Sequence, residues 1–296
     1  MSTESISTRF EQLDLWPTED AIAAMLEGQL AAAATVQAQA GALAAAAEAA
    51  AERLRDPAGR LIYAGAGTSG RLAVLDGVEL GPTFGWDEAR TLFLLAGGTA
   101  ALTQAVEGAE DDAPVAERAV SEAVLGPADV LIGVAASGRT PYTLAAIRAA
   151  AGAGVLTIGI ANSADTPLLA ACDHPILLGT GAEILAGSTR MKAGTAQKIA
   201  LNSFSTALMI RLNRTHAGLM TDMRLSNAKL RRRAAAMVAR VAEVDPAAAA
   251  DALDRSGGQI KAAILIARGL EPARAGSLLE ASAGSLRGAL GEISAT

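Results

Sequence analysis

Two turns rich in glycine and hydroxyl residues each follow a run of strand-forming residues, and this pattern constrains the fold more than any other feature of the chain. The run from Arg60 to Gly65 leads into Ala-Gly-Thr-Ser-Gly-Arg at 66–71, and the run from Asp129 to Ala136 leads into Ser-Gly-Arg-Thr at 137–140. A parallel strand followed by such a turn and a helix makes an anion site, because backbone N–H groups, hydroxyls and the helix N-terminus all attract negative charge. Two such turns at one sheet edge predict a single ligand, a phosphate ester that carries further hydroxyls.

The alternation of strand-like and helix-like segments predicts the fold class. Strand-like runs occur at 60–66, 90–96, 129–136, 154–161 and 175–179. Helical patterns lie between them at about 69–80, 99–108, 112–124, 141–152 and 165–171, and one long helix follows from Met191 to Leu212. Apolar strands separated by helices predict an α/β chain with a doubly wound five-stranded parallel sheet. Ligands of such sheets bind outside the carboxyl ends of the strands, where both turns lie.

The regions on either side of this pattern are predicted to be helical. Residues 1–54 are interpreted as an N-terminal helical segment, residues 55–228 as the sugar-phosphate-binding domain and residues 229–296 as a small C-terminal all-helical module. The N-terminal helices are expected to cover the sheet or to serve a dimer interface, through one apolar face made of Leu26, Leu30, Val36, Ala40 and Leu43. From residue 245 onward we expect three short helices, separated by glycine-containing turns at 256–258 and 269–272.

Composition excludes several classes of function. With 19% charged residues and a net charge of −6, neither a nucleic-acid partner nor a membrane-surface partner is expected. The single Cys172 excludes an intramolecular disulfide framework and fits a reducing cytoplasm, where we expect it to be a buried small residue. The two histidines belong to no cluster with metal-ligand spacing, so no metal is expected. The polar N-terminus lacks the apolar core of a secretory signal.

Carboxylates near two of the predicted strands are candidates for proton transfer. Glu79 lies on the helix that begins at the first turn, and its neighbours there are apolar, so we expect a desolvated carboxylate with a raised pKa. A second group follows the second strand, and most of its members are expected to face solvent: Glu107, Glu110, Asp111 and Asp112. Ser188 and Thr189 precede the long helix, and they either cap it or face the ligand.

The first turn also satisfies Gly-x-Gly-x-x-Gly, the pattern typical of dinucleotide binding. That function needs an acidic residue near the end of the second strand to hold the ribose. Here the second strand runs into Gly97 and Gly98, while Asp87 and Glu88 precede it. The second hydroxyl turn therefore favours a phosphorylated sugar over a dinucleotide.

Five segments resemble the N-acetylmuramic acid 6-phosphate etherases, a family of the sugar isomerase (SIS) superfamily. They are Ala64–Leu72, Asp76–Gly85, Glu107–Asp112, Ala136–Tyr142 and Gly187–Lys198. The resemblance runs in the family's order from about residue 55 to the C-terminus. It implies the SIS fold for the parallel sheet, and the tail after residue 245 resembles the small helical domain, related to ubiquitin-associated (UBA) folds, that ends this family.

The resemblance implies a carbon–oxygen lyase that uses no cofactor and no metal. Such an enzyme cleaves the lactyl ether of N-acetylmuramic acid 6-phosphate with water, in a step of cell-wall recycling, and works as a homodimer with sites near the subunit interface. By motif match, Glu79 is the acid for the departing lactate and then the base for water, and Glu110 is the base at C2. The residues matched to substrate binding are Thr68, Ser69, Gly70, Ser137, Gly138, Arg139, Thr140, Ser188 and Thr189.

Three segments depart from the family's patterns. Leu80-Gly81-Pro82 stands where Cys-Pro-Pro is common, Gly218–Asp222 where Asn-Leu-Met-Val-Asp is usual, and the N-terminus lacks Thr-Glu-x-Arg-Asn. Two other functions remain open on the same fold: a non-catalytic sugar-phosphate-binding regulator, such as the glucokinase regulatory protein, and an aldose–ketose isomerase. The pair Glu79 and Glu110 favours the etherase over a regulator, because binding alone needs no proton-transfer groups.

Overall fold

The computed structural model describes residues 3–294, which form two compact units. The first unit comprises the residues up to Gly77 together with Ala89–Leu208, and the second comprises Val78–Glu88 together with the chain from Met209 onward. Within the described residues, no helix by itself combines the length and the apolar character needed to cross a membrane. The helices α1 (Thr18–Ala38) and α2 (Ala40–Leu54) meet both criteria only as a pair bent by 56°.

A five-stranded parallel sheet forms the centre of the first unit, as predicted. Its strands are β1 (Leu61–Gly65), β2 (Thr91–Leu95), β3 (Val130–Val134), β4 (Leu156–Ala161) and β5 (His174–Leu177). They lie in the order β2-β1-β3-β4-β5 and pair in parallel throughout. Every residue of β1, β3 and β4 is buried, as expected for strands covered on both faces. The strand order reverses between β1 and β3, so a ligand crevice is expected at their carboxyl ends.

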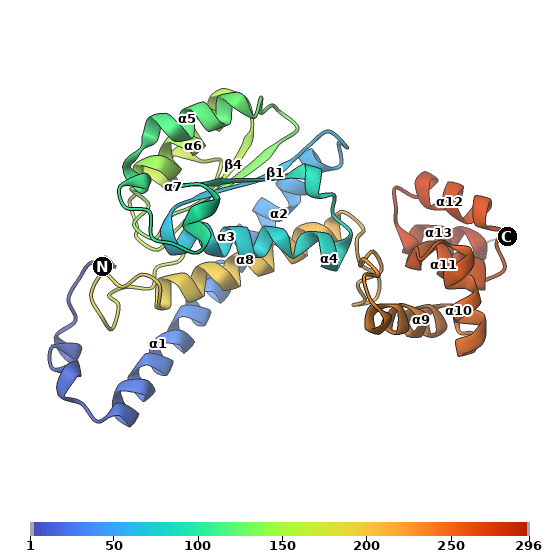
Figure 1. Ribbon diagram of the computed structural model, residues 1–296, viewed down its shortest axis with the longest axis horizontal. Helices are drawn as coiled ribbons and strands as arrows, with labels where there is room; N and C mark the ends of the chain where they lie inside the picture. The colour runs from blue at the N-terminus through green and yellow to red at the C-terminus, as the bar shows by residue number, and fades with distance from the viewer. Residues whose placement is uncertain (1–2, 295–296) are drawn as a thin grey trace. The chain divides into compact units, whose positions relative to one another are not determined.

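Helices cover both faces of this sheet (Figure 1). On one face lie α5 (Ala113–Glu122), α6 (Pro141–Gly152) and α7 (Pro167–Ala171), and on the other lie α2 (Ala40–Leu54), α3 (Gly67–Val78) and α8 (Lys192–Arg211). The N-terminal segment adds the 3-10 turns Thr8–Phe10 and Leu13–Leu15 and then α1 (Thr18–Ala38), in which Thr18 is the first helical residue and Pro17 takes the N-cap position. The structure therefore is the predicted doubly wound α/β fold.

A buried carboxylate fixes α3 to the sheet and to α8. Asp76 of α3 accepts hydrogen bonds from the Tyr63 hydroxyl of β1 at 2.9 Å, from Asn202 Nδ2 at 2.6 Å and from the Ser205 hydroxyl at 3.0 Å. Burial raises the pKa of Tyr63, and the neighbouring Asp76 raises it further, so the phenol stays protonated and keeps donating. The helix that carries the first hydroxyl turn is thereby held on two sides.

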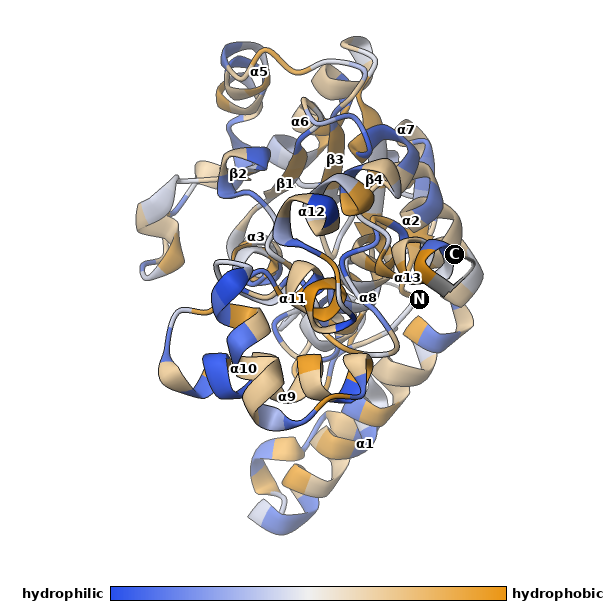
Figure 2. Cartoon of the chain, turned by 90° about the vertical axis from the view of Figure 1, so that its right-hand side faces the viewer, coloured by the Kyte–Doolittle hydropathy of each residue, from blue (hydrophilic) through white to orange (hydrophobic). Residues whose placement is uncertain are grey.

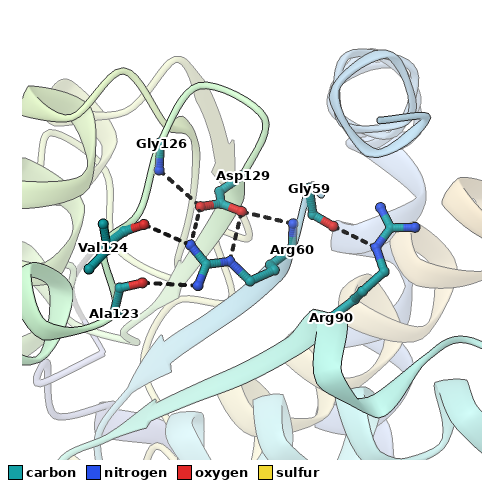
Figure 3. Close-up of polar contacts among 7 residues, drawn as sticks. All are labelled: Gly59, Arg60, Arg90, Ala123, Val124, Gly126 and Asp129. Carbon is teal, nitrogen blue, oxygen red and sulfur yellow. Dashed lines mark hydrogen bonds and ion pairs between the residues drawn. The ribbon is translucent and has the colours of Figure 1, made fainter. Parts of the chain in front are cut away.

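An ion pair at the amino ends of the central strands fixes their alignment (Figure 3). Arg60 and Asp129 pair at 2.7 Å, and Asp129 also accepts the backbone N–H groups of Arg60 and Gly126 at 2.8 and 2.9 Å. The Arg60 guanidinium donates in addition to two carbonyl oxygens of the loop before β3. Arg90, just before β2, donates to the Gly59 carbonyl at 2.6 Å. These contacts join β2, β1 and β3 at their amino ends, opposite the carboxyl ends where the ligand site is predicted.

The segment 99–108 differs from the prediction of a helix. Only Thr99–Leu102 forms a 3-10 turn, after Gly97 and Gly98 in left-handed conformations. Arg71 of α3 donates to the Ala101 carbonyl at 2.7 Å and to the Gln104 carbonyl at 2.9 Å. These two contacts hold the irregular segment to α3.

The second unit consists of helices and their connections, and the longest connection, 212–227, contains an isolated bridge between His216 and Leu219. It begins with α4 (Leu80–Phe84) and continues with α9 (Ala228–Ala242), α10 (Pro246–Arg255), α11 (Ile260–Ala267), α12 (Pro272–Ala281) and α13 (Leu286–Ser294). Figure 2 shows apolar residues gathered on α11, whose residues from Ile260 to Ile266 are all buried. Four helices follow residue 245, whereas three were predicted. The missed break is the turn at Ala283-Gly284, where the Gly284 N–H donates to the Leu279 carbonyl and ends α12.

Candidate functional site

A cavity of about 430 Å³ lies in the first unit at the carboxyl ends of β1 and β3. It is lined by both hydroxyl turns, by a short acidic turn and by two further segments. The lining residues are Glu4, Ala66, Gly67, Thr68, Ser69, Glu110, Asp111, Ala135, Ala136, Ser137, Arg139, Thr140, Pro141 and Thr189. The structure thus brings seven of the eleven predicted site residues to one cavity: Thr68, Ser69, Glu110, Ser137, Arg139, Thr140 and Thr189.

The first turn passes directly from β1 into α3, and it needs glycine at two places. A Cβ at Gly65 would lie 2.9 Å from the Cα of Gly70, and a Cβ at Gly70 would lie 2.5 Å from Leu95. These glycines let α3 start against the strand, so that Thr68 and Ser69 lie in the first helical turn beside the cavity. Gly70 does not line the cavity, and its place in the structure is this close packing.

The second turn, between β3 and α6, has a similar construction. Gly138 is left-handed, with φ +62°, and a Cβ there would lie 2.4 Å from the Thr166 hydroxyl. Gly138 is therefore packed against Thr166 and does not line the cavity. Ser137 and Thr140 of the same turn do line the cavity. The Ser137 hydroxyl accepts the N–H of Arg139 at 3.2 Å. The Arg139 guanidinium donates to the Asp165 carbonyl at 3.2 Å, which steadies it at the rim.

The electrostatics of the cavity suit an anion bound by neutral donors. The N-termini of α3 and α6, each twelve residues long, begin at its edge and supply partial positive charge and unpaired N–H groups. Thr140 makes no capping hydrogen bond with its own side chain, which leaves that hydroxyl available to a ligand. Arg139 adds a full positive charge, while Glu4, Glu110 and Asp111 add negative charge elsewhere in the lining. A phosphate is thus favoured at the turns, and hydrogen-bond donors of the ligand are favoured near the carboxylates.

The acidic group after β2 divides into residues with different roles. Glu110 and Asp111 belong to the 3-10 turn Ala109–Asp111 and line the cavity, both with exposed side chains. Asp112 instead caps α5 and accepts the Val115 N–H at 3.2 Å. Arg71 of α3 holds the preceding loop at Ala101 and Gln104, and the turn that carries Glu110 contacts α6.

Thr189 reaches the cavity on the loop between β5 and α8, and a buried glutamate holds this loop to the start of α8. Glu183, 1% exposed, accepts the N–H groups of Lys192 and Ala193 at 3.0 and 2.9 Å. Glu183 therefore satisfies N–H groups in the first turn of α8, so of the two alternatives left open for Ser188 and Thr189, capping is not needed at these positions. Thr189 lines the cavity; Ser188 does not, and its N–H donates to the Leu185 carbonyl within the loop. Sequence reasoning missed Glu183 because its partners follow nine and ten residues later.

Glu79 lies apart from these residues along the chain. It directly follows Val78, the last residue of α3, while Ser69 lies in the first turn of that helix. Ten residues at a rise of about 1.5 Å each place roughly 15 Å of helix between them. Glu79 is exposed, and Leu75 and Val78 are each 50% exposed. The predicted desolvation of this carboxylate is therefore wrong for the single chain, because Glu79 itself is exposed although the adjacent Leu80 is buried.

Glu4 was not predicted to belong to the site. It lines the cavity together with the two hydroxyl turns, and the adjacent Thr3 is buried with 1% exposure. Across the described chain, no three His, Cys, Asp or Glu side chains are grouped closely enough to hold a metal ion. Burial raises the pKa of the Cys172 thiol to about 11, and this half-buried residue does not line the cavity.

Comparison with known proteins places this geometry in a family context. The SIS domain model matches residues 113–207, and the model of the glucokinase regulatory protein N-terminal SIS domain matches residues 42–151. The chain is 50% identical to the N-acetylmuramic acid 6-phosphate etherase of Deinococcus radiodurans over 291 residues, 98% of this chain and 95% of the relative. It is 46% identical to the etherase of the same name from Rubrobacter xylanophilus, again over 98% of this chain and 96% of the relative.

Solved structures share the fold at low sequence identity. A phosphoheptose isomerase from Francisella tularensis has a TM-score of 0.50 and 18% identity, with 66% of this chain and 100% of that chain covered. A putative phosphosugar isomerase from Bacteroides fragilis has a TM-score of 0.50 and 20% identity, with 68% of this chain and 99% of that chain covered. The parallel sheet and its surrounding helices are therefore an SIS fold.

Proposed function

The chain belongs to the family of N-acetylmuramic acid 6-phosphate etherases, and from this premise we propose that it cleaves the D-lactyl ether of N-acetylmuramic acid 6-phosphate with water. The products are N-acetylglucosamine 6-phosphate and D-lactate. The observation that carries the proposal is the cavity in which two hydroxyl turns and Glu110 meet. We place the reaction in the cytoplasm, in the recycling of cell-wall amino sugars.

The phosphate is bound at the two turns. The hydroxyls of Ser69, Ser137 and Thr140 donate to its oxygens, and the first N–H groups of α3 and α6 add further donors. Thr68, Arg139 and Thr189 complete this end of the site. Gly70 and Gly138 give the turns their shape and do not contact the ligand. Ser188 supports the loop that carries Thr189. Because the phosphate lies far from the reacting carbons, it anchors the sugar and contributes binding energy to orientation.

The chemistry needs two proton-transfer groups at neighbouring carbons. In the ring-opened sugar the aldehyde acidifies the C2 proton, which Glu110 removes. As the C2=C3 double bond forms, the C3–O bond to lactate breaks, and the lactate oxygen takes a proton from Glu79. Water then adds its oxygen to C3 and gives a proton to Glu79, while Glu110 returns a proton to C2. Both glutamates end in their initial protonation states, so no redox partner is required.

Glu79 reaches the sugar, we infer, from a second copy of the chain. About 15 Å of α3 separates Glu79 from the phosphate turn of its own chain, whereas Glu79 of the partner subunit has no such constraint. Exposed apolar residues on α1 support a homodimer, because Ile22, Leu26 and Leu30 follow at four-residue spacing and are 50, 60 and 75% exposed. Much of α1 is coloured as apolar in Figure 2. A partner helix would bury this row.

The direct test is release of D-lactate from N-acetylmuramic acid 6-phosphate by the purified chain. Sugar-phosphate binding without lactate would favour a non-catalytic regulator, and interconversion of aldose and ketose phosphates without lactate would favour an isomerase. In D₂O containing H₂¹⁸O, the product should carry deuterium at C2 and ¹⁸O at C3. Label in the lactate instead would exclude elimination from the sugar.

Mixing two inactive variants tests the shared site. Glu79→Gln and Glu110→Gln should each release no D-lactate while still binding the sugar phosphate. After joint refolding, half of the dimers are mixed, and each mixed dimer has one intact site, so about a quarter of the wild-type activity should return. No recovery, with mixed dimers present by native mass spectrometry, would place both glutamates of one site on one chain.

A further inference from the structure

The N-terminal segment of residues 3–7, here called the strap, contributes Glu4 to the wall of the sugar-phosphate cavity. The Thr3 side chain is buried, and the Thr3 carbonyl accepts the N–H of Gly187 at 3.3 Å. The next residue, Glu4, lines the cavity together with Ser69, Ser137 and Glu110. The strap therefore lies on the loop that carries Thr189 and presents an acidic side chain to the same space as the two turns.

Contacts within the strap and directly after it fix its position and that of the Glu4 carboxylate. The Thr3 hydroxyl donates to Glu4 Oε1 at 3.5 Å. Glu4 Oε2 lies 3.0 Å from the position that a Cβ at Gly187 would take, and Gly187 has φ +74°, so a glycine at this point leaves room for the carboxylate. Two residues beyond the strap, Arg9 pairs with Glu27 of α1 at 2.6 Å, which ties the segment that follows the strap to that helix. Glu183 holds the loop on which the strap lies, through its hydrogen bonds to the start of α8.

The chemistry of a carboxylate decides what Glu4 can recognise. An ionised carboxylate accepts hydrogen bonds and repels anions, so Glu4 disfavours the phosphate and favours neutral donors. On the assumption that the proposed function is correct, we propose that Glu4 is a substrate-binding residue that accepts hydrogen bonds from the hydroxyl groups of the open-chain sugar. Glu4 thereby selects for a polyhydroxylated body on the phosphate, and the two turns select for the phosphate itself.

Because Glu4 binds the sugar hydroxyls and the two turns bind the phosphate, substitution of Glu4 should affect the affinities for a sugar phosphate and for inorganic phosphate differently. In Glu4→Ala, affinity for N-acetylglucosamine 6-phosphate should fall about tenfold or more, since charge-assisted hydrogen bonds are lost. Affinity for inorganic phosphate should stay the same or rise, because a nearby negative charge is gone. In Ser69→Ala, both affinities should fall. Glu4→Gln keeps the shape of the side chain and one acceptor oxygen. Its affinity for the sugar phosphate should therefore lie between that of the wild type and that of Glu4→Ala.

The experiment is isothermal titration calorimetry of the full chain with each of these two ligands. Glu11→Ala is the matched control, because Glu11 is an exposed glutamate of the same N-terminal segment, does not line the cavity and gives the same change of charge. Unchanged sugar-phosphate affinity in Glu4→Ala and Glu4→Gln would overturn the proposal. Equal losses for both ligands would also overturn it, because the strap would then support the whole pocket. These outcomes are independent of lactate release by the wild type, on which the etherase assignment depends.

Discussion

Glu183 offers the sharpest test of how the cavity is held together. Its carboxylate accepts two backbone N–H groups at the start of α8, and only 1% of the residue is exposed. Glu183→Gln keeps the shape of the side chain but turns one acceptor oxygen into an NH₂ group that faces an N–H. A charge-assisted hydrogen bond worth about 1.5–3 kcal/mol is lost. Removal of the negative charge from the helix N-terminus costs up to about 1–2 kcal/mol more.

The free energy that keeps this loop closed should therefore fall by about 2–4 kcal/mol in Glu183→Gln. Hydrogen exchange of the peptide 183–195, followed by mass spectrometry, should speed up by about 30-fold or more. Because the loop carries Thr189 to the cavity, KM for the sugar phosphate should rise about tenfold, while kcat changes less. The variant thus tests a positioning role, since a general loss of folding would lower the active fraction and leave KM unchanged.

Asp245→Asn is the matched control for this prediction. Asp245 caps α10 and also accepts two backbone N–H groups, at 2.9 Å each, but its side chain is exposed. Asparagine caps a helix about as well as aspartate, and water solvates the exposed amide. We therefore expect the free energy of unfolding to change by less than about 0.5 kcal/mol and KM to stay the same. Exchange in Glu183→Gln that is as slow as in the wild type, with unchanged KM, would refute the reasoning.

Three further predictions concern other parts of the chain. Ser69→Ala should raise KM about tenfold with kcat within about twofold, and an unchanged KM in steady-state kinetics would move the phosphate elsewhere. Burial alone would raise the pKa of Asp129, but the hydrogen bonds from Arg60 and Gly126 outweigh it and lower the pKa. Asp129→Asn should therefore lose about 2–4 kcal/mol in urea unfolding at pH 7, and the difference from wild type should shrink as the pH falls below about 4; a pH-independent difference would contradict this. Because the pKa of Cys172 is raised to about 11 by burial, its alkylation at pH 8 should be roughly 100-fold slower in the folded chain than in urea, and equal rates would exclude its burial.

The parallel sheet could be predicted from the sequence because its strands are short apolar runs with clear ends. All five predicted runs contain the observed strands or overlap them, and β1, β3 and β4 are buried on both faces. The position of the ligand cavity followed from the same pattern. Parallel strands share one carboxyl edge, so two hydroxyl turns after β1 and β3 had to lie close together.

Contacts between residues distant in the sequence account for the errors. Arg71 bonds two carbonyls thirty or more residues later, in a segment where the local pattern favours a helix that does not form. Ser188 and Gly138 are next to cavity residues in the sequence, but they are not among the residues that line the cavity. Glu4 is separated by more than 180 residues from the loop on which it lies. Such a contact leaves no periodic signal in the sequence. The place of Glu4 at the cavity is explained by the structure, in which the adjacent Thr3 is buried.

A crystal structure of the chain with N-acetylglucosamine 6-phosphate tests the central claim most directly. We expect phosphate oxygens within about 3 Å of the Ser69, Ser137 and Thr140 hydroxyls. The sugar C2 should face Glu110 within about 3.5 Å, and C3 should face Glu79 of the partner subunit. A phosphate bound outside the two turns, or a sugar whose C2 lies beyond the reach of Glu110, would contradict the account.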